Sequence, residues 1–372
     1  MTRRKIAFVG NSALTMMNFR LGVMKELSRE HDVIMVTPKD CDLTPLDGTT
    51  IRFVPVEVDC KGLNPFKDLR LLHSLKEIYT TEKVDFVFHY TIKPIVYGSM
   101  AATSLGIKHI DVVTGLGYTF IRRNWLFRLS CMLHKMALRK TDAVWFLNQD
   151  DCDTFVKLKL VSQSKVRVIH GEGVDTSFFT AKKDPKKEFI FMYFGRMLRS
   201  KGVMLFIRAA SQLKKEYPDV HWQLLGQLDA LNPDAITPEE VEIWVRRGVV
   251  EYLGVSKDVR PYLEKASCIV LPSYYMEGVP RSLMEAASME RAIIATDSVG
   301  CKDVVLDGIN GLLCEKRSLE DLIATMRKML ELPREELAKM GKRGRELMLR
   351  KFDEQIIIRT YKRALRTYLG NA

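Results

Sequence analysis

The sequence from residue 191 to residue 202 reads Phe191-Met192-Tyr193-Phe194-Gly195-Arg196-Met197-Leu198-Arg199-Ser200-Lys201-Gly202. An apolar run, a glycine and two cations before a helical stretch predict a buried strand, a tight turn and a helix. Arg196 can fork onto phosphate oxygens and Lys201 can act as a point charge. Amides of a helix that begins near Ser200 would add donors. A solvated basic loop explains this stretch equally well when it is read by itself.

The same alternation of apolar runs and helical stretches recurs along the chain. In the first half we predict strands at Ile6–Val9, Val33–Thr37, Ile51–Val56, Phe86–His89, His109–Val113, Ala143–Phe146 and Val166–Ile169. In the second half we predict strands at Phe189–Phe194, His221–Leu225, Val249–Leu253, Cys268–Leu271, Ala292–Ala295 and Gly311–Cys314. Helical stretches such as Phe19–Ser28 and Leu69–Thr80 lie between them, which favours parallel sheets covered on both faces. The lysine-rich passage Phe178–Glu188 has the composition of an interdomain linker.

Length and composition indicate an ordinary globular protein of two domains. The chain has 372 residues, of which 47% are hydrophobic and 28% charged. Its net charge of +12 suits nucleic acid, an anionic membrane or a phosphorylated substrate. Zinc-finger spacing, Arg-Gly repeats and an RNA-recognition signature are missing from the sequence, which disfavours nucleic acid. Seven scattered cysteines without a Cys-x-x-Cys pair predict reduced thiols in a cytosolic protein.

A second informative stretch, from 277 to 285, follows the predicted strand at 268–271 and reads Glu277-Gly278-Val279-Pro280-Arg281-Ser282-Leu283-Met284-Glu285. Pro280 fits the first turn of a helix, which places Glu277 on the loop and Glu285 on the helix. Both carboxylates would border a helix N-terminus, which attracts anions. Carboxylates beside an anion site suggest a ligand that carries both phosphate and hydroxyl groups, such as a sugar nucleotide. The loop that contains Leu253 could hold a nucleobase through its backbone, although a plain connection fits it as well.

Several motifs in fixed order resemble the retaining glycosyltransferases of family 4. They are Gly195-Arg196…Lys201-Gly202, Leu271-Pro272-Ser273, Glu277-x₇-Glu285, Ala295-Thr296-Asp297 and Asp307-Gly308-Ile309-Asn310-Gly311. The resemblance implies an α/β fold of the GT-B type, with two Rossmann-like parallel-sheet domains facing across a cleft. We expect an acceptor-binding domain at 1–175, a nucleotide-sugar-binding domain at 176–352 and a C-terminal helix at 353–372 that packs back on the first domain.

Site residues follow from this resemblance. Arg196 and Lys201 would bind the diphosphate of a nucleotide sugar, Glu285 the ribose hydroxyls, and Glu277 would lie near the transferred sugar. The implied catalytic residues are therefore Glu277, Arg196 and Lys201. The implied donor-binding residues are Gly195, Arg196, Lys201, Leu253, Glu277, Gly278, Val279, Pro280 and Glu285. Because the sequence shows no Asp-x-Asp motif or histidine cluster in a suitable place, we expect no metal ion and no cofactor.

The first domain differs from the commonest pattern of the family. Many relatives carry a histidine after the strand at 109–113, where this chain has Val113-Thr114-Gly115-Leu116-Gly117-Tyr118-Thr119-Phe120. This form is similar to a subgroup that transfers N-acetylhexosamines, from donors such as UDP-GalNAc or UDP-GlcNAc, to undecaprenyl-diphosphate sugars in bacterial surface-glycan or glycoprotein-glycan assembly. The implied acceptor-side candidates are Asn18, Arg20, Lys93, Gly115 and Gly117. For Arg20 and Lys93 a structural role is equally consistent with the sequence.

Residues 118–140 form a basic amphipathic stretch without an acidic residue. Such a helix can lie in an anionic membrane surface, or it can pack its apolar stripe on the sheet and leave its cations in water. The membrane-contact candidates are Arg122, Arg123, Trp125, Arg128, Lys135 and Arg139. Together with the lipid-linked acceptor that the resemblance implies, these residues predict a cytoplasmic enzyme that is held peripherally on the inner face of the cytoplasmic membrane. The alternatives are a sugar-nucleotide epimerase or hydrolase on the same fold, and a non-enzymatic protein that binds nucleotide or nucleic acid.

Overall fold

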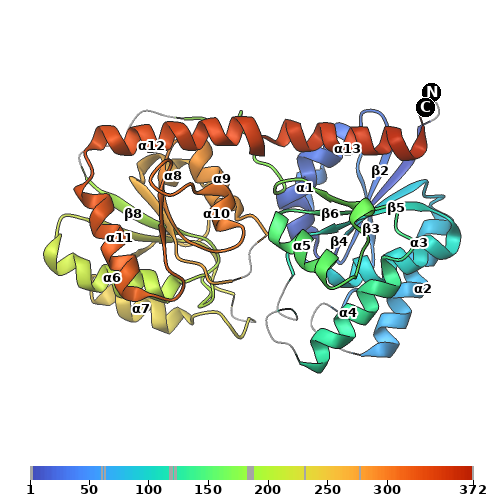
Figure 1. The fold of residues 1–372 in the computed structure, drawn as a ribbon, viewed down its shortest axis with the longest axis horizontal. Coiled ribbons are helices and arrows are strands. Elements are labelled where there is room, and N and C mark those ends of the chain that lie inside the picture. Colours follow the sequence, from blue (N-terminus) through green and yellow to red (C-terminus); the bar gives the residue numbers. More distant parts are fainter. Residues whose placement is uncertain are drawn as a thin grey trace. The chain divides into compact units, whose positions relative to one another are not determined.

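The computed structural model describes residues 3–59, 62, 64–116, 120, 124–181, 188–229, 232–275 and 278–370. The chain divides into two units, each built on its own parallel sheet (Figure 1). Unit 1 comprises Met1–Gly173 together with Glu354–Ala372, and unit 2 comprises Val174–Asp353. The chain therefore leaves unit 1 after Gly173 and returns to it through its last helix.

Unit 1 contains a seven-stranded sheet in the order β3-β2-β1-β4-β5-β6-β7, and all of its strand pairs are parallel. Its strands are β1 (Lys5–Val9), β2 (Asp32–Thr37), β3 (Arg52–Pro55), β4 (Phe86–Tyr90), β5 (Lys108–Val113), β6 (Ala143–Phe146) and β7 (Val166–Val168). Its helices are α1 (Ala13–Leu27), α2 (Pro65–Thr81), α3 (Ser99–Leu105), α4 (Trp125–Ala137), α5 (Gln149–Lys157) and α13 (Glu354–Leu369). Short turns are η1 (Thr44–Leu46), the π-helical η2 (Pro94–Gly98) and η4 (Gln163–Lys165).

The helices of unit 1 cover both faces of its sheet, as parallel strands require. Helices α1 and α13 pack together on one face, whereas α2, α3 and α4 lie on the other (Figure 1). The α13 face is rich in aromatic side chains. Tyr361 of α13 packs on Phe88 and Trp145 with ring centroids 4.8 and 4.9 Å apart. Its hydroxyl also forms a hydrogen bond of 2.8 Å with that of Tyr90. The last helix of the chain thus completes the core of unit 1.

Unit 2 contains a six-stranded parallel sheet in the order β10-β9-β8-β11-β12-β13. Its strands are β8 (Ile190–Phe194), β9 (His221–Leu225), β10 (Glu251–Tyr252), β11 (Cys268–Leu271), β12 (Ala292–Thr296) and β13 (Leu312–Cys314). Its helices are α6 (Val203–Glu216), α7 (Pro238–Arg246), α8 (Arg260–Lys265), α9 (Arg281–Ser288), α10 (Cys301–Val304), α11 (Leu319–Glu331) and α12 (Arg334–Leu347), followed by the π-helical turn η5 (Met348–Phe352). Helices α6 and α11 pack on one face of the sheet, and α9 and α12 on the other (Figure 1).

Every strand predicted from the sequence is present, and both sheets are parallel as predicted. The helices differ more from the bounds predicted for them. Helix α1 begins six residues before the predicted Phe19, because the Ser12 side chain caps it by accepting from the amide of Thr15. The C-terminal helix predicted at 353–372 begins at Glu354, after the turn η5 and Asp353, whose backbone is extended. Among the described residues, no helix is long and apolar enough to cross a membrane.

Candidate donor and acceptor sites

The carboxyl ends of three neighbouring strands of unit 2 are joined by backbone hydrogen bonds. The amide of Gly195, after β8, donates to the carbonyl of Leu225 at 3.0 Å. The amide of Gly226, after β9, donates to Gly254, after β10, at 2.9 Å. A Cβ atom on Gly226 would lie 1.9 Å from the Gly195 carbonyl oxygen, so only glycine allows this approach. This edge of a parallel sheet is where ligands bind in α/β folds.

The two stretches singled out in the sequence meet at this edge. The carbonyl of Ser200 accepts hydrogen bonds from the amides of Tyr274 and Tyr275 at 2.8 and 3.0 Å. Gly202 approaches the end of β11 so closely that a Cβ atom on it would lie 2.1 Å from the Pro272 carbonyl oxygen. The loop with Arg196 and Lys201 is therefore fixed against the segment that leads into α9.

Arg196 lies on the exposed side of this loop. Its guanidinium group forms no hydrogen bond or ion pair with a residue that the structure describes, whereas nearby Arg199 is paired with Glu240 at 2.6 Å. Lys201 is half-buried. Helix α6 begins only at Val203, later than the predicted start near Ser200, because Gly202 adopts a left-handed conformation with φ of +80°. Arg196 is thus oriented by loop geometry and remains available to an anion.

Helix α9 carries Glu285, the residue predicted to bind the ribose hydroxyls. Glu285 is its fifth residue and is only 8% exposed, and its Oε1 accepts from Nε of Arg281 at 2.8 Å. Burial raises the pKa of the Glu285 carboxyl, although the neighbouring Arg281 partly opposes the effect. Pro280 is the residue before the first turn rather than part of it.

The remaining donor-side candidates of unit 2 surround this helix and the sheet edge. Gly278 and Val279 are half-buried in the loop before α9. Leu253 is also half-buried and donates its amide to Leu224 at 2.9 Å. Glu277 lies outside the described residues, and its assignment stays a prediction. The sequence did not reveal the backbone bridge from Ser200 to Tyr274 and Tyr275, because hydrogen bonds between carbonyls and amides leave no side-chain signal.

Two acceptor-side candidates of unit 1 are paired with carboxylates that the sequence analysis did not identify. Arg20 is buried, forms a short ion pair with Glu172 and stacks its guanidinium 4.1 Å from the ring centre of Tyr90. Lys93 donates through Nζ to Oδ1 of Asp68 at 2.6 Å. Binding of an acceptor diphosphate by either cation would therefore compete with an existing ion pair. Glu172 and Asp68 could not be found from the sequence because they lie 152 and 25 residues from their partners.

The other candidates of unit 1 have different surroundings. Asn18 is exposed on α1, and Gly115, just after β5, has φ of +141°. Gly117, Arg122 and Arg123 lie outside the described residues. His89 and Asp111 are fully buried and share a hydrogen bond of 2.9 Å from Nδ1 to Oδ1, and Tyr79 contacts Nε2 of His89 at 2.9 Å. This arrangement fits a structural role for His89.

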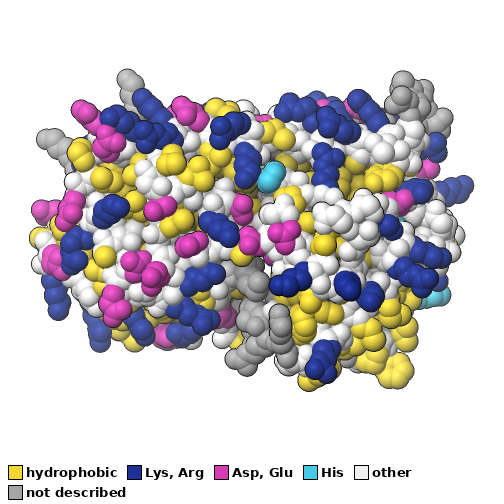
Figure 2. Space-filling view, in the orientation of Figure 1, with side chains coloured by type: hydrophobic (Ala, Val, Ile, Leu, Met, Phe, Trp, Pro, Cys, Tyr) yellow, Lys and Arg dark blue, Asp and Glu magenta, His cyan; other side chains and the backbone are white. Residues whose placement is uncertain are grey.

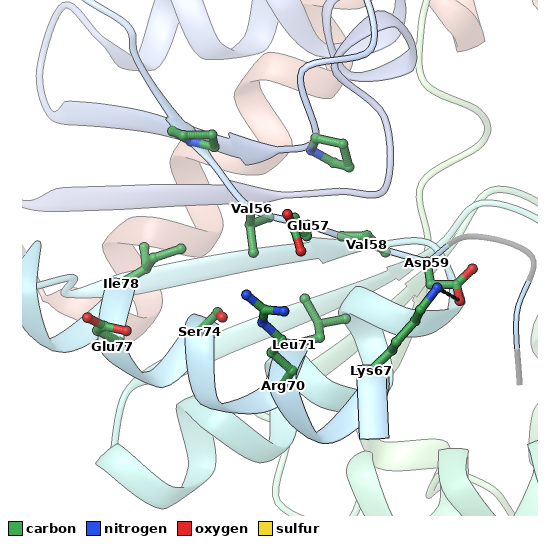
Figure 3. A pocket seen from close by; sticks show the side chains of 12 residues that line it. Val56, Glu57, Val58, Asp59, Lys67, Arg70, Leu71, Ser74, Glu77 and Ile78 are labelled. Carbon is green, nitrogen blue, oxygen red and sulfur yellow. Dashed lines mark ion pairs between the residues drawn. The ribbon is translucent and has the colours of Figure 1, made fainter. Parts of the chain in front are cut away.

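A concave pocket of about 630 Å³ lies in unit 1 between the segment after β3 and helix α2 (Figure 3). Lys67 and Asp59 form an ion pair of 3.2 Å at one end, and Arg70 points from α2 into the pocket. Among the described residues, the side chains of Glu57 and Arg70 form no hydrogen bond. The pocket lies beside the carboxyl ends of β2 and β3, and its mixed charges suit a ligand rich in hydroxyl groups. The acceptor-side candidates that the structure describes, Asn18, Arg20, Lys93 and Gly115, do not line it.

Helix α4 exposes three residues of its apolar stripe, Trp125, Met132 and Met136, whereas the other two, Leu129 and Leu133, are half-buried. Its buried residues are Ser130, His134 and Ala137, whereas Trp125 is 64% exposed and Met136 59% exposed. The alternative in which this stripe packs on the sheet is therefore wrong for Trp125 and Met136. In Figure 2, hydrophobic side chains gather at the lower right, over the region where Figure 1 draws α4 and α2. The predicted membrane-contact cations of this helix and its end are exposed as well: Arg128, Lys135 and Arg139.

Groups of three or more His, Cys, Asp or Glu side chains that could hold a metal ion do not occur among the described residues.

Comparison with known proteins identifies both units. Residues 188–332 match the family described as glycosyl transferases group 1, and residues 5–148 match the family described as glycosyl transferase 4-like. The N,N'-diacetylbacillosaminyl-diphospho-undecaprenol alpha-1,3-N-acetylgalactosaminyltransferase of Campylobacter jejuni is 26% identical over 376 residues, which cover 96% of this chain and 97% of the relative. The UDP-Gal:alpha-D-GlcNAc-diphosphoundecaprenol alpha-1,3-galactosyltransferase of Escherichia coli is 24% identical, covering 80% and 79%. A glycosyltransferase crystal structure from Rickettsia africae superposes with a TM-score of 0.83 at 18% identity, covering 100% of both chains.

Proposed function

Because the chain belongs to the glycosyltransferases that join a 4-like domain to a group 1 domain, we propose that it transfers an N-acetylhexosamine to a sugar on polyprenyl diphosphate. The likeness to the Rickettsia glycosyltransferase confirms the predicted fold of two Rossmann-like domains. The proposed donor is UDP-GalNAc or UDP-GlcNAc, and the proposed product is a bacterial surface glycan or glycoprotein glycan. The names of the Campylobacter and Escherichia relatives support this acceptor class, and the Escherichia name supports a UDP-linked donor.

One structural observation carries the donor side of the proposal. The loop with Arg196 is bonded through Ser200 to the segment that leads into α9, where Glu285 lies buried. A cation that can bind phosphate and a carboxylate that can accept hydrogen bonds from a diol are therefore held at the same edge of one sheet, where the carboxyl ends of its strands lie. Nucleoside diphosphates require both groups, and this sheet edge is the usual ligand position of such folds. We propose that Arg196 and Lys201 bind the diphosphate and Glu285 the ribose.

The proposed reaction retains the configuration of the transferred sugar. The bond between the anomeric carbon and the diphosphate oxygen breaks, and the sugar becomes oxocarbenium-like. The acceptor hydroxyl then forms its bond on the same face, and its proton passes to an oxygen of the leaving UDP. Negative charge grows on the diphosphate as the bond breaks, so Arg196 and Lys201 would stabilise the transition state more than the ground state. Glu277 is proposed to lie near the transferred sugar. We propose that these cations make the reaction independent of a metal ion.

The acceptor is proposed to reach the enzyme from a membrane surface. Helix α4 presents exposed apolar and basic side chains with no acidic residue between 125 and 140. Apolar side chains flanked by cations bind to the interface of anionic membranes. We therefore propose a peripheral position on the inner face of the cytoplasmic membrane, with Trp125 and Arg128 among the contacting residues.

The test combines a panel of UDP-sugars with prenyl-diphosphate-linked sugar acceptors. We expect turnover with an N-acetylhexosamine donor that needs acceptor and survives EDTA. Loss of a charged group aligned with a developing anion costs about 10²–10³ in kcat, so Arg196→Ala should lose that much, and Glu277→Gln should also be severely impaired. Arg199→Ala is the matched control, because its exposed ion pair with Glu240 is worth at most about 1 kcal/mol.

Three outcomes would contradict the proposal. Consumption of the donor without acceptor would indicate a hydrolase or an epimerase. Undiminished transfer by Glu277→Gln, or equal losses in Arg196→Ala and Arg199→Ala, would remove the site assignment.

A further inference from the structure

An apolar slot lies within unit 1 between α4, η2 and the first turns of α2. It has a volume of about 90 Å³, and its apolar walls come from Ile92, Val96, Leu126, Leu129 and Leu133. A cavity needs about 15 Å³ to hold one water molecule, so the slot has room for a group several times that size. A branched hydrocarbon of a few carbon atoms, such as one isoprene unit, is in this size range.

The charged groups that line the slot are paired with each other. Lys93 donates to Oδ1 of Asp68 at 2.6 Å, and the hydroxyl of Tyr97 donates to Oδ2 of the same carboxylate at 2.9 Å. Both members of the ion pair are about 15% exposed. The carboxylate therefore already has a donor on each oxygen, and a polar ligand would gain little from it.

The remaining polar residues of the slot are also hydrogen-bonded. The Nδ1 atom of His134 contacts the carbonyl oxygen of Ser130 at 2.8 Å and its hydroxyl at 3.3 Å. No polar side-chain atom of the slot is buried without a hydrogen bond among the described residues. A concave site with apolar walls and satisfied polar groups favours an apolar occupant.

The helices that border the slot carry unusually exposed apolar side chains. Phe66 and Leu69 of α2 are 80% and 61% exposed, and Trp125, Met132 and Met136 of α4 are more than half exposed. Contiguous exposed apolar side chains mark interaction sites on soluble proteins. The cations Arg128 and Lys135 lie on the same helix, and α4 contains no acidic residue. The surroundings of the slot thus suit a ligand that is apolar and bears negative charge at one end.

We propose that this slot binds the isoprene unit next to the diphosphate of the prenyl-linked acceptor. The inference rests on the proposed function and extends it, because it assigns a place to the lipid portion of the acceptor. Lys93 borders the slot, so the diphosphate bonded to this isoprene unit would lie near this cation and would compete with Asp68 for it. The slot would distinguish a prenyl acceptor from a nucleotide-linked or free sugar.

Direct binding tests the slot without using transfer activity. The probes are farnesyl diphosphate, inorganic diphosphate and a saturated dodecyl diphosphate, each below its critical micelle concentration, titrated calorimetrically into the full chain without lipid. We expect farnesyl diphosphate to bind at least tenfold more tightly than inorganic diphosphate, which corresponds to about 1.4 kcal/mol. Leu129→Trp, which fills the slot, should reduce that ratio to less than threefold. Leu105→Trp places the same substitution on the exposed end of α3 and should keep the full ratio. Thermal unfolding checks that both variants fold.

Three results would overturn the proposal. The first is equal binding of farnesyl and inorganic diphosphate. The second is a farnesyl preference that Leu129→Trp leaves unchanged. The third is dodecyl diphosphate binding as tightly as farnesyl diphosphate, which would assign the slot to membrane acyl chains. Because these titrations contain no sugar nucleotide, failure here is distinguishable from failure of the transferase proposal.

Discussion

At the scale of single residues, the site of unit 2 depends on two groups in opposite environments. Arg196 is exposed and has no hydrogen-bonding partner among the described side chains, so it can bind phosphate without first breaking an ion pair. Glu285 is buried beside Arg281, where its charge is disfavoured unless further donors reach it. A diol that donates two hydrogen bonds would supply such donors. Ligand binding and the protonation state of Glu285 should therefore be coupled.

This coupling predicts how UDP affinity changes with pH. Burial raises the folded-state pKa of Glu285, so the native state holds this proton more tightly than the unfolded state, and stability falls as pH rises from the ordinary carboxyl pKa through the folded one. Ribose hydroxyls favour the carboxylate, so UDP must displace the proton below the folded pKa. We expect affinity to rise with pH by up to about tenfold per unit in that window. Calorimetric titration of UDP at several pH values measures this rise.

Glu285→Gln is the control for this prediction, because glutamine keeps the size of the side chain and cannot titrate. The phosphate groups of UDP contribute equally to both proteins, so only the difference between the two pH profiles reports Glu285. Identical profiles would show that this carboxyl does not contact the ligand.

At the scale of elements, the donor site is formed by the ends of neighbouring strands. Their backbones approach one another so closely that a side chain between them would not fit. Gly226 combines a φ of +150° with contact to the Gly195 carbonyl, whereas Gly254, its hydrogen-bonding partner, has a φ of +75° and open space where a Cβ would be. Substitution of each glycine by alanine therefore distinguishes the effect of backbone conformation, which both share, from the effect of steric contact, which only Gly226 has.

We expect Gly226→Ala to destabilise unit 2 by about 3 kcal/mol or more and to weaken UDP binding, because the methyl group would push β8 and β9 apart. Gly254→Ala should cost only the conformational strain, about 1–2 kcal/mol. Denaturant unfolding and UDP titration of both variants measure the difference. Equal losses would mean that the close approach of the two strand ends is unimportant.

At the scale of the molecule, both ends of the chain contribute to unit 1. Tyr361 of α13 contacts Phe88 and Tyr90 of β4 and Trp145 of β6, two strands of the sheet formed by the first half. Unit 1 can therefore complete its core only after the last helix has been synthesised. Unit 2 is continuous in sequence and needs no such return.

Substitution of Tyr361 should accordingly destabilise unit 1 and leave the stability of unit 2 unchanged. Truncation of a large buried aromatic side chain costs about 3–5 kcal/mol, so Tyr361→Ala should raise amide hydrogen exchange in β4 and β6. Arg363→Ala, at an exposed position of the same helix, should leave exchange unchanged. Exchange measured by mass spectrometry should show little change in β8 and β11. Equal destabilisation of both units would contradict the independent cores described above.

The sequence by itself determined the strands, both parallel sheets and the order of the donor-side motifs. Hydrophobic runs bounded by glycine and proline are local signals, and a run buried on both faces is apolar throughout. Only the tertiary structure decided what those residues meet: Arg20 with Glu172, Lys93 with Asp68, Ser200 with Tyr274, and α13 with the first sheet. The tertiary structure also leaves Trp125, Met132 and Met136 of α4 exposed, side chains that a helix packed by this stripe would have buried. Such contacts join residues far apart in the chain, and ion pairs and backbone bridges have no periodicity from which a sequence could reveal them.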